Sequence, residues 1–258
     1  MLSPSGTVPF LVKEPSIPLC AGFLLVFLLR YLLKERRRDI RIALIAFFCL
    51  VGSVGTYSIA AKEGGLINTR YDLYIYRIDQ LLHINEPGAA MGRVLLAHWW
   101  GVWGINFVYG FITAAVMLLL VAYTSRPEYR EVLYAILLNL AIAPFLYAAI
   151  PVSGPQFAFG SFPVLPAFVT PHIIYMHSAP NGVPSVHFST ALLIWWYSRK
   201  WLWPLLSASA FLLLTEIATL ASGQHYVFDL IAAVPYTAGA VLTATALCQR
   251  QRAGHCSP

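Results

Sequence analysis

Two histidines stand beside residue types that suit phosphoryl chemistry. His225 precedes Asp229 by four positions, so the two side chains share a face if this run is helical. A carboxylate beside an imidazole fixes the tautomer of the ring and makes its other nitrogen more basic. The pair therefore suits a histidine that acts as a nucleophile or general base. The alternative is a structural pair that caps a helix at the membrane interface.

His187 directly follows Pro184, Ser185 and Val186, where an apolar segment begins. A histidine there can protonate a departing alcohol and later take the proton of an incoming one. The amides at a helix start, together with the Ser185 hydroxyl, offer donors to a phosphate, although serine is also a common helix N-cap. The two runs together predict covalent phosphoryl transfer through a histidine, with no metal and no cofactor.

The bulk composition indicates a membrane protein. Of the 258 residues, 59% are hydrophobic and 11% are charged, against roughly 25% charged in a soluble domain, and the mean hydropathy is +0.68. We therefore expect one all-α bundle solvated by lipid. The net charge of +6 arises from basic residues in short loops, which is a topology signal and not evidence for a nucleic-acid partner. The four cysteines show no CxxC spacing, so neither a disulfide framework nor a zinc site is predicted.

Apolar runs and turn residues divide the chain into expected elements. The predicted membrane spans cover residues 17–33, 40–60, 99–123, 131–150, 186–197 (a short one), 202–220 and 226–247. Residues 66–96 show apolar side chains at steps of three and four that include Leu81, whereas Asp72 and Asp79 fall between them on a polar face. This predicts an amphipathic helix in the membrane interface, and the alternative is a purely structural helix that covers the bundle. The loop 151–184 is rich in Pro and Gly and is expected at the interface or folded over a cavity.

Basic residues predict which loops face the cytoplasm. The basic runs at 34–41, 126–130, 199–200 and 250–252 fall on one side of the seven-span arrangement, which the charge rule makes cytoplasmic. Both histidine runs then face the non-cytoplasmic side. The expected organisation is an N-terminal segment 1–39 with an extra span, a catalytic membrane domain 40–247 and a cytoplasmic tail 248–258.

The two histidine runs resemble the second and third signature motifs of the type 2 phosphatidic acid phosphatase superfamily. The His-Tyr-x-x-Asp form of the run that begins at His225 is similar to the inositol-phosphorylceramide synthase and sphingomyelin synthase branch. The resemblance covers roughly residues 60–247 and implies a six-helix core formed by the second to seventh spans. It implies that His225 attacks phosphorus, that Asp229 orients His225, and that His187 serves the leaving and entering hydroxyls.

The chain departs from the phosphatase-like members at two places. Their first motif, a lysine followed seven positions later by Arg-Pro, has no counterpart here. Ala218 and Thr219 stand where those members have Ser-Arg before the third-motif histidine. The departures favour the lipid phosphotransferase branch. Arg70 and Arg77, on the expected outer side, are candidates to bind the phosphate in place of the missing arginines.

The sequence thus predicts an inositolphosphotransferase-like membrane enzyme that moves a phosphoryl headgroup from a lipid donor to an alcohol through a phosphohistidine. Hydrolysis of lipid or polyprenyl phosphates, with water as the acceptor, is the alternative enzyme. A transporter or structural membrane protein is the alternative of another class, although the chain shows no repeated halves of the kind many transporters have. The identity of donor and acceptor, and the need for a partner subunit, stay open.

Overall fold

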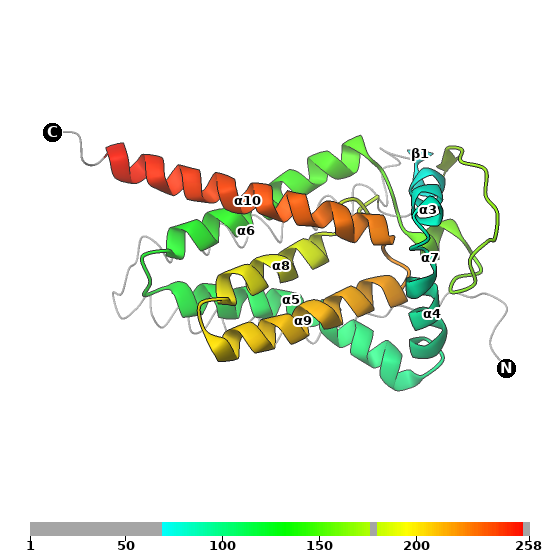
Figure 1. The fold of residues 1–258 in the computed structure, drawn as a ribbon, viewed down its shortest axis with the longest axis horizontal. Coiled ribbons are helices and arrows are strands. Elements are labelled where there is room, and N and C mark those ends of the chain that lie inside the picture. Colours follow the sequence, from blue (N-terminus) through cyan, green and yellow to red (C-terminus); the bar gives the residue numbers. More distant parts are fainter. Residues whose placement is uncertain (1–68, 176–179, 255–258) are drawn as a thin grey trace.

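A computed structural model describes residues 69–175 and 180–254 (Figure 1). The predicted spans at 17–33 and 40–60 lie outside the described residues, as does the predicted N-terminal segment 1–39. Within the described part the fold is a helix bundle, which confirms the predicted all-α class. The division into three predicted segments stays a prediction.

Four helices are long and apolar enough to cross a membrane. They are α5 (Trp99–Tyr123), α6 (Tyr129–Ala149), α9 (Leu202–Ala221) and α10 (Val227–Gly254). Side chains outside the buried core of these helices are largely apolar, as expected where lipid replaces water. The predicted spans 99–123, 131–150 and 202–220 match these helices closely, whereas α10 extends beyond the predicted end at residue 247.

The fifth predicted span is α8 (Val186–Ser198), and it differs from the others. Its 13 residues rise about 20 Å at 1.5 Å per residue, which is short of a hydrocarbon core of roughly 30 Å. It packs against α5, α6, α9 and α10, and Ala191 and Leu193 at its middle are completely buried. A buried bond from Asn139 Nδ2 to Thr190 Oγ1 (3.1 Å) joins it to α6. We conclude that α8 is a short helix enclosed by the bundle, whose first turn is held at one end of it.

The prediction of one amphipathic helix over residues 66–96 is wrong in two respects. The described part of this segment forms two helices, α3 (Asp72–Leu81) and α4 (Glu86–Leu95), separated by a turn in which His83 has a positive φ of 56°. The buried face of α3 also carries its acids, because Asp72 and Asp79 find backbone donors inside the protein. Leu81, assigned to the apolar face, is exposed.

The long segment between α6 and α8 lies beside α3, at the end of the bundle where α3 and α4 are found (Figure 1). It contains the short helix α7 (Pro155–Ala158) and strand β2 (Ile174–Tyr175), which pairs antiparallel with β1 (Thr69–Arg70). Tyr76 of α3 fastens it by donating to Pro166 O at 2.8 Å and by packing on Phe159 with ring centroids 4.7 Å apart. The segment therefore forms a cover over the end of the bundle where α8 and α10 begin.

The opposite end of the bundle carries the basic loops. The loop from α5 to α6 and the loop from α8 to α9 are joined there by Lys200 Nζ and Glu128 Oε1 at 2.8 Å. Arg126 lies over the ring of Trp201, 5.0 Å from its centroid. These basic loops therefore share one end, and α3, α4 and α7 lie at the other (Figure 1).

Candidate active site

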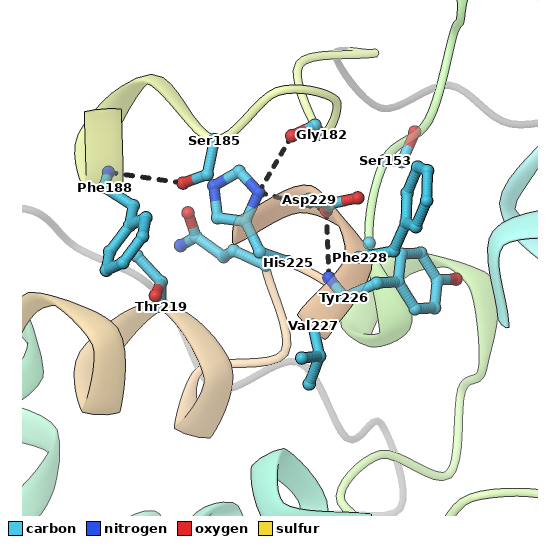
Figure 2. A network of polar contacts seen from close by, with 12 residues as sticks. Ser153, Gly182, Ser185, Phe188, Thr219, His225, Tyr226, Val227, Phe228 and Asp229 are labelled. Carbon is cyan, nitrogen blue, oxygen red and sulfur yellow. Dashed lines mark hydrogen bonds and ion pairs between the residues drawn. The ribbon is translucent and has the colours of Figure 1, made fainter. Parts of the chain in front are cut away.

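His225 lies in the turn that connects α9 to α10, and its ring is held by two acceptors. Gly223 gives the turn a left-handed residue (φ 70°), a conformation that glycine adopts without strain. The Nδ1 atom of His225 is 3.1 Å from the carbonyl oxygen of Gly182 and 3.2 Å from Asp229 Oδ2 (Figure 2). Because a carbonyl oxygen only accepts, these partners assign the proton to Nδ1. The lone pair is then on Nε2, which points toward Ser185 (Figure 2).

Asp229 is completely buried beneath His225 in the first turn of α10. Its Oδ2 accepts from His225 Nδ1 and also from the amide of Tyr226 at 2.9 Å. Its Oδ1 has no hydrogen-bond partner among the described residues. The predicted i, i+4 pair therefore exists in the geometry that fixes the tautomer of His225.

A backbone hydrogen bond joins the two histidine runs directly. The amide of Ser185 donates to the main-chain oxygen of Asp229 at 3.2 Å. The Ser185 hydroxyl accepts from the amide of Phe188 at 3.4 Å, so Ser185 is the N-cap of α8. This is the structural alternative that the sequence left open for Ser185. The start of α8 therefore lies beside the Nε2 edge of His225.

His187 occupies the first turn of α8, two residues after Ser185, whose amide is bonded to the main-chain oxygen of Asp229. It is half-buried, and its ring packs on Tyr109 of α5 with centroids 4.5 Å apart at an angle of 60°. The structure thus brings both predicted histidines and Asp229 into one site. An imidazole with a free Nε2 beside a second imidazole suits nucleophilic attack coupled to proton transfer.

Asp72 is a buried acid near this site that the sequence reading missed. Its carboxylate accepts from the amides of Ser153 (3.1 Å) and Gly154 (2.7 Å) and from the hydroxyl of Tyr226 (3.1 Å). Burial raises its pKa to about 6, although the two amides act in the opposite direction. Asp72 therefore ties α3 to the loop at 151–154 and to the residue that follows His225.

Asp79 is the second acid that the sequence analysis missed, and it lies two turns after Asp72 on the same face of α3. Its two carboxylate oxygens accept from the amides of Val227 (2.9 Å) and Phe228 (3.0 Å), which begin α10 and have no carbonyl partner within that helix. The spacing of seven between Asp72 and Asp79 was the signal that both lie on one face of α3. Through these bonds, α3 holds the turn that carries His225 and Asp229.

Burial raises the pKa of Asp79 to about 7, which predicts how pH affects stability. The unfolded chain loses this proton near pH 4, so between about pH 4 and 7 the folded state binds one more proton and its stability falls as pH rises. Asp79→Asn removes this titration. We expect the melting temperature of the wild type, measured in detergent across this window, to fall more steeply than that of Asp79→Asn. Parallel slopes would contradict the assignment.

The two candidate phosphate-binding arginines, Arg70 and Arg77, differ in burial and in hydrogen bonding. Arg70 is completely buried and donates from Nε to Ser153 Oγ (3.0 Å) and from Nη1 to Thr69 O (3.1 Å). Arg77 is half-exposed on α3, and within residues 69–175 and 180–254 its side chain makes no hydrogen bond or ion pair. For both arginines, contact with a substrate stays a prediction.

Ala218 and Thr219, which stand at the Ser-Arg positions of the phosphatase-like members, offer no free hydrogen-bond donor to a phosphate. Thr219 is buried, and its hydroxyl donates to the carbonyl oxygens of Thr215 (2.8 Å) and Glu216 (2.9 Å). Ala218 is buried as well. In the described part of the chain, no group of three or more His, Cys, Asp or Glu side chains is arranged to hold a metal ion. Metal independence nevertheless stays a prediction that experiment has to test.

Three comparisons with known proteins complete the description. A family model described as the PAP2 superfamily matches residues 73–243, which include all of α3 except its first residue and most of α10, and which contain all three predicted catalytic residues. The curated proteins gave no match, and neither did the solved structures.

Proposed function

The chain belongs to the PAP2 superfamily, a group of phosphatases and phosphotransferases, and we propose that it transfers a phosphoryl headgroup from a lipid donor to an alcohol. Family membership and the four apolar helices make it a lipid-directed enzyme of this type in a membrane. The finer proposal, an inositolphosphotransferase-like reaction, rests on the His-Tyr-x-x-Asp form and on Ala218 and Thr219 at the expected Ser-Arg positions.

The mechanism we propose has two half-reactions. In the first, the Nε2 lone pair of His225 forms a bond to phosphorus, the bond to the leaving oxygen breaks, and that oxygen takes a proton from His187. In the second, His187 removes a proton from the incoming hydroxyl, whose oxygen attacks the phosphohistidine and frees His225. Asp229 stabilises the positive charge that His225 carries between these steps.

The observation that carries this proposal is the junction of the two runs. The bond from Ser185 N to Asp229 O and the bond from His225 Nδ1 to Gly182 O hold the start of α8 against His225. The amides of Ser185 and Phe188 at this helix start are already bonded to Asp229 O and Ser185 Oγ. The amides of Val186 and His187 have no carbonyl partner within the helix, so we propose that they donate to a phosphate held between the two imidazoles. We propose Ser185, Arg70 and Arg77 as further substrate-binding residues.

The charge rule supports a site on the non-cytoplasmic face of the membrane. Arg126, Arg199 and Lys200 belong to loops at the end of the bundle opposite α3 and α4, and loops of this kind accumulate on the cytoplasmic side. A reagent that modifies histidine but does not cross the membrane tests this proposal. The reagent should inactivate the enzyme in intact cells and in right-side-out vesicles.

One assay separates the proposed transferase from the hydrolase and from the non-enzymatic alternatives. Phosphatidic acid, phosphatidylinositol and phosphatidylcholine, each labelled in the headgroup phosphate, are supplied with and without a hydroxyl acceptor such as inositol, glycerol or diacylglycerol. Transfer of label that depends on the acceptor supports the transferase. Release of a free labelled phosphate compound, whether or not an acceptor is present, supports hydrolysis. A transporter would break no phosphorus–oxygen bond at all.

Activity is expected to survive removal of divalent metal ions, because two imidazoles and a carboxylate supply nucleophile and proton transfer. The measurement is the transfer rate of purified enzyme before and after EDTA treatment, and the expected change is less than about twofold. A loss that zinc restores would overturn the proposal and draw attention to the exposed His172 of the covering loop.

A further inference from the structure

The ring of His187 lacks the hydrogen bonds that fix His225. His225 Nδ1 has two acceptors, Gly182 O and Asp229 Oδ2. In the described part of the chain, neither ring nitrogen of His187 has a hydrogen-bond partner within the protein. Both nitrogens are thus left to a substrate, and another contact has to set the direction in which the ring points.

Tyr109 supplies that contact. It lies on α5, and its ring centroid is 4.5 Å from that of His187 with the planes tilted by 60°, within the range of favourable edge-to-face pairs. No other aromatic ring of the described residues pairs with His187. The packing restricts rotation of the His187 ring without occupying either of its nitrogens.

The hydroxyl of Tyr109 extends the contact to the turn that carries His225. It is 3.4 Å from Ser222 Oγ, and Ser222 precedes His225 by three residues. Ser222 Oγ donates its one proton to Thr219 O (3.0 Å) and accepts from the amide of Gln224 (3.4 Å). Because the one hydroxyl proton of Ser222 is already donated to Thr219, Tyr109 is the donor in its bond with Ser222. One side chain contacts the ring of His187 and is anchored beside His225.

We propose that Tyr109 is a positioning residue that holds the His187 ring in register with His225, so that His187 can protonate the leaving oxygen. This inference rests on the proposed function. It predicts a loss that depends on the leaving group: an alkoxide needs the proton from His187, whereas 4-nitrophenolate leaves phosphorus with the electron pair and needs none.

The test compares the first half-reaction on two donors under single-turnover conditions. The donors are the phospholipid of the panel above that the wild type converts fastest, and 4-nitrophenyl phosphate, whose phenolate release reports phosphohistidine formation. The variants are Tyr109→Leu, which removes ring and hydroxyl, and Tyr109→Phe, which removes only the hydroxyl. Tyr123→Phe is the matched control, because Tyr123 lies on the same helix α5 and donates its hydroxyl to Tyr197 O at the far end of the bundle.

We expect Tyr109→Leu to slow the phospholipid reaction by about 10- to 100-fold, as misplacement of a reacting group does, and the 4-nitrophenyl phosphate reaction by less than about threefold. Tyr109→Phe should show a smaller loss of the same kind, and Tyr123→Phe should match the wild type on both donors. Equal loss on both donors, or no loss in either Tyr109 variant, would overturn the inference.

His187→Ala in the same assay separates this inference from the function on which it rests. If His187→Ala loses activity on the phospholipid alone and the Tyr109 variants do not, the positioning role of Tyr109 fails and the proposed mechanism stands. If His187→Ala slows both donors equally, His187 does not protonate the leaving group and the proposed mechanism itself fails.

Discussion

Replacing His225 with alanine is expected to reduce phosphoryl transfer by at least about 10⁴-fold, because loss of a covalent nucleophile removes the reaction path itself. His225 Nε2 is the nitrogen left free by the bonds of Nδ1 to Gly182 and Asp229, and no other imidazole in the described residues has a carboxylate partner of this kind. The measurement is the rate of label transfer from the phospholipid panel by purified protein in detergent.

Accumulation of a phosphohistidine provides a second readout of the same variant. Rapid denaturation during turnover should trap an acid-labile, alkali-stable label in the wild type, and none in His225→Ala. His172→Ala is the control, because His172 is exposed on the segment between α6 and α8 and its Nδ1 lies 2.8 Å from Thr170 O. A His225→Ala protein that still forms the labelled intermediate, or still turns over, is incompatible with the mechanism.

The sequence predicted the parts of the site that follow from local spacing. The separation of four between His225 and Asp229 places both side chains at one helix start, and the structure joins them at 3.2 Å. The span at 99–123 was predicted with the bounds of α5, because an uninterrupted apolar run of this length has few alternatives to a helix that crosses the membrane. Composition and periodicity are sufficient for features of this kind.

The contribution of α3 was beyond local pattern. Asp72 and Asp79 were assigned to a polar, outward face because acids on an amphipathic helix usually meet water. Their partners are backbone amides and a hydroxyl at residues 153, 154 and 226–228, far along the chain. Only the tertiary fold shows that these donors exist, so periodicity alone selected the wrong face.

Tyr109 illustrates a different limit of the sequence. It is one of several aromatic residues in the 25-residue apolar helix α5, and no property of its neighbours in the chain distinguishes it from a lipid-facing or core tyrosine. Its contact with His187 follows from the packing of α5 against α8, and its link to Ser222 from the packing of α5 against α9. The enclosed position of α8 likewise depends on four neighbouring helices and not on its own composition.

Asp229→Asn is expected to slow the reaction by about 10²- to 10³-fold and to leave the tautomer of His225 unchanged. In catalytic triads the same change costs about 10⁴-fold because the ring adopts the wrong tautomer. Here the carbonyl oxygen of Gly182, 3.1 Å from Nδ1, accepts only and keeps the proton on that nitrogen in the variant. The loss should therefore reflect the missing negative charge alone.

Which ring nitrogen of His225 carries the proton can be measured independently of the reaction rate. Nitrogen-15 chemical shifts of His225, in protein labelled at histidine, should show the proton on Nδ1 in both the wild type and Asp229→Asn. Asp229→Ala is the matched variant, because it also removes the acceptor for the Tyr226 amide and should lose more activity and more thermal stability. A loss of about 10⁴-fold in Asp229→Asn with the proton moved to Nε2 would mean that Asp229, and not Gly182, sets the tautomer.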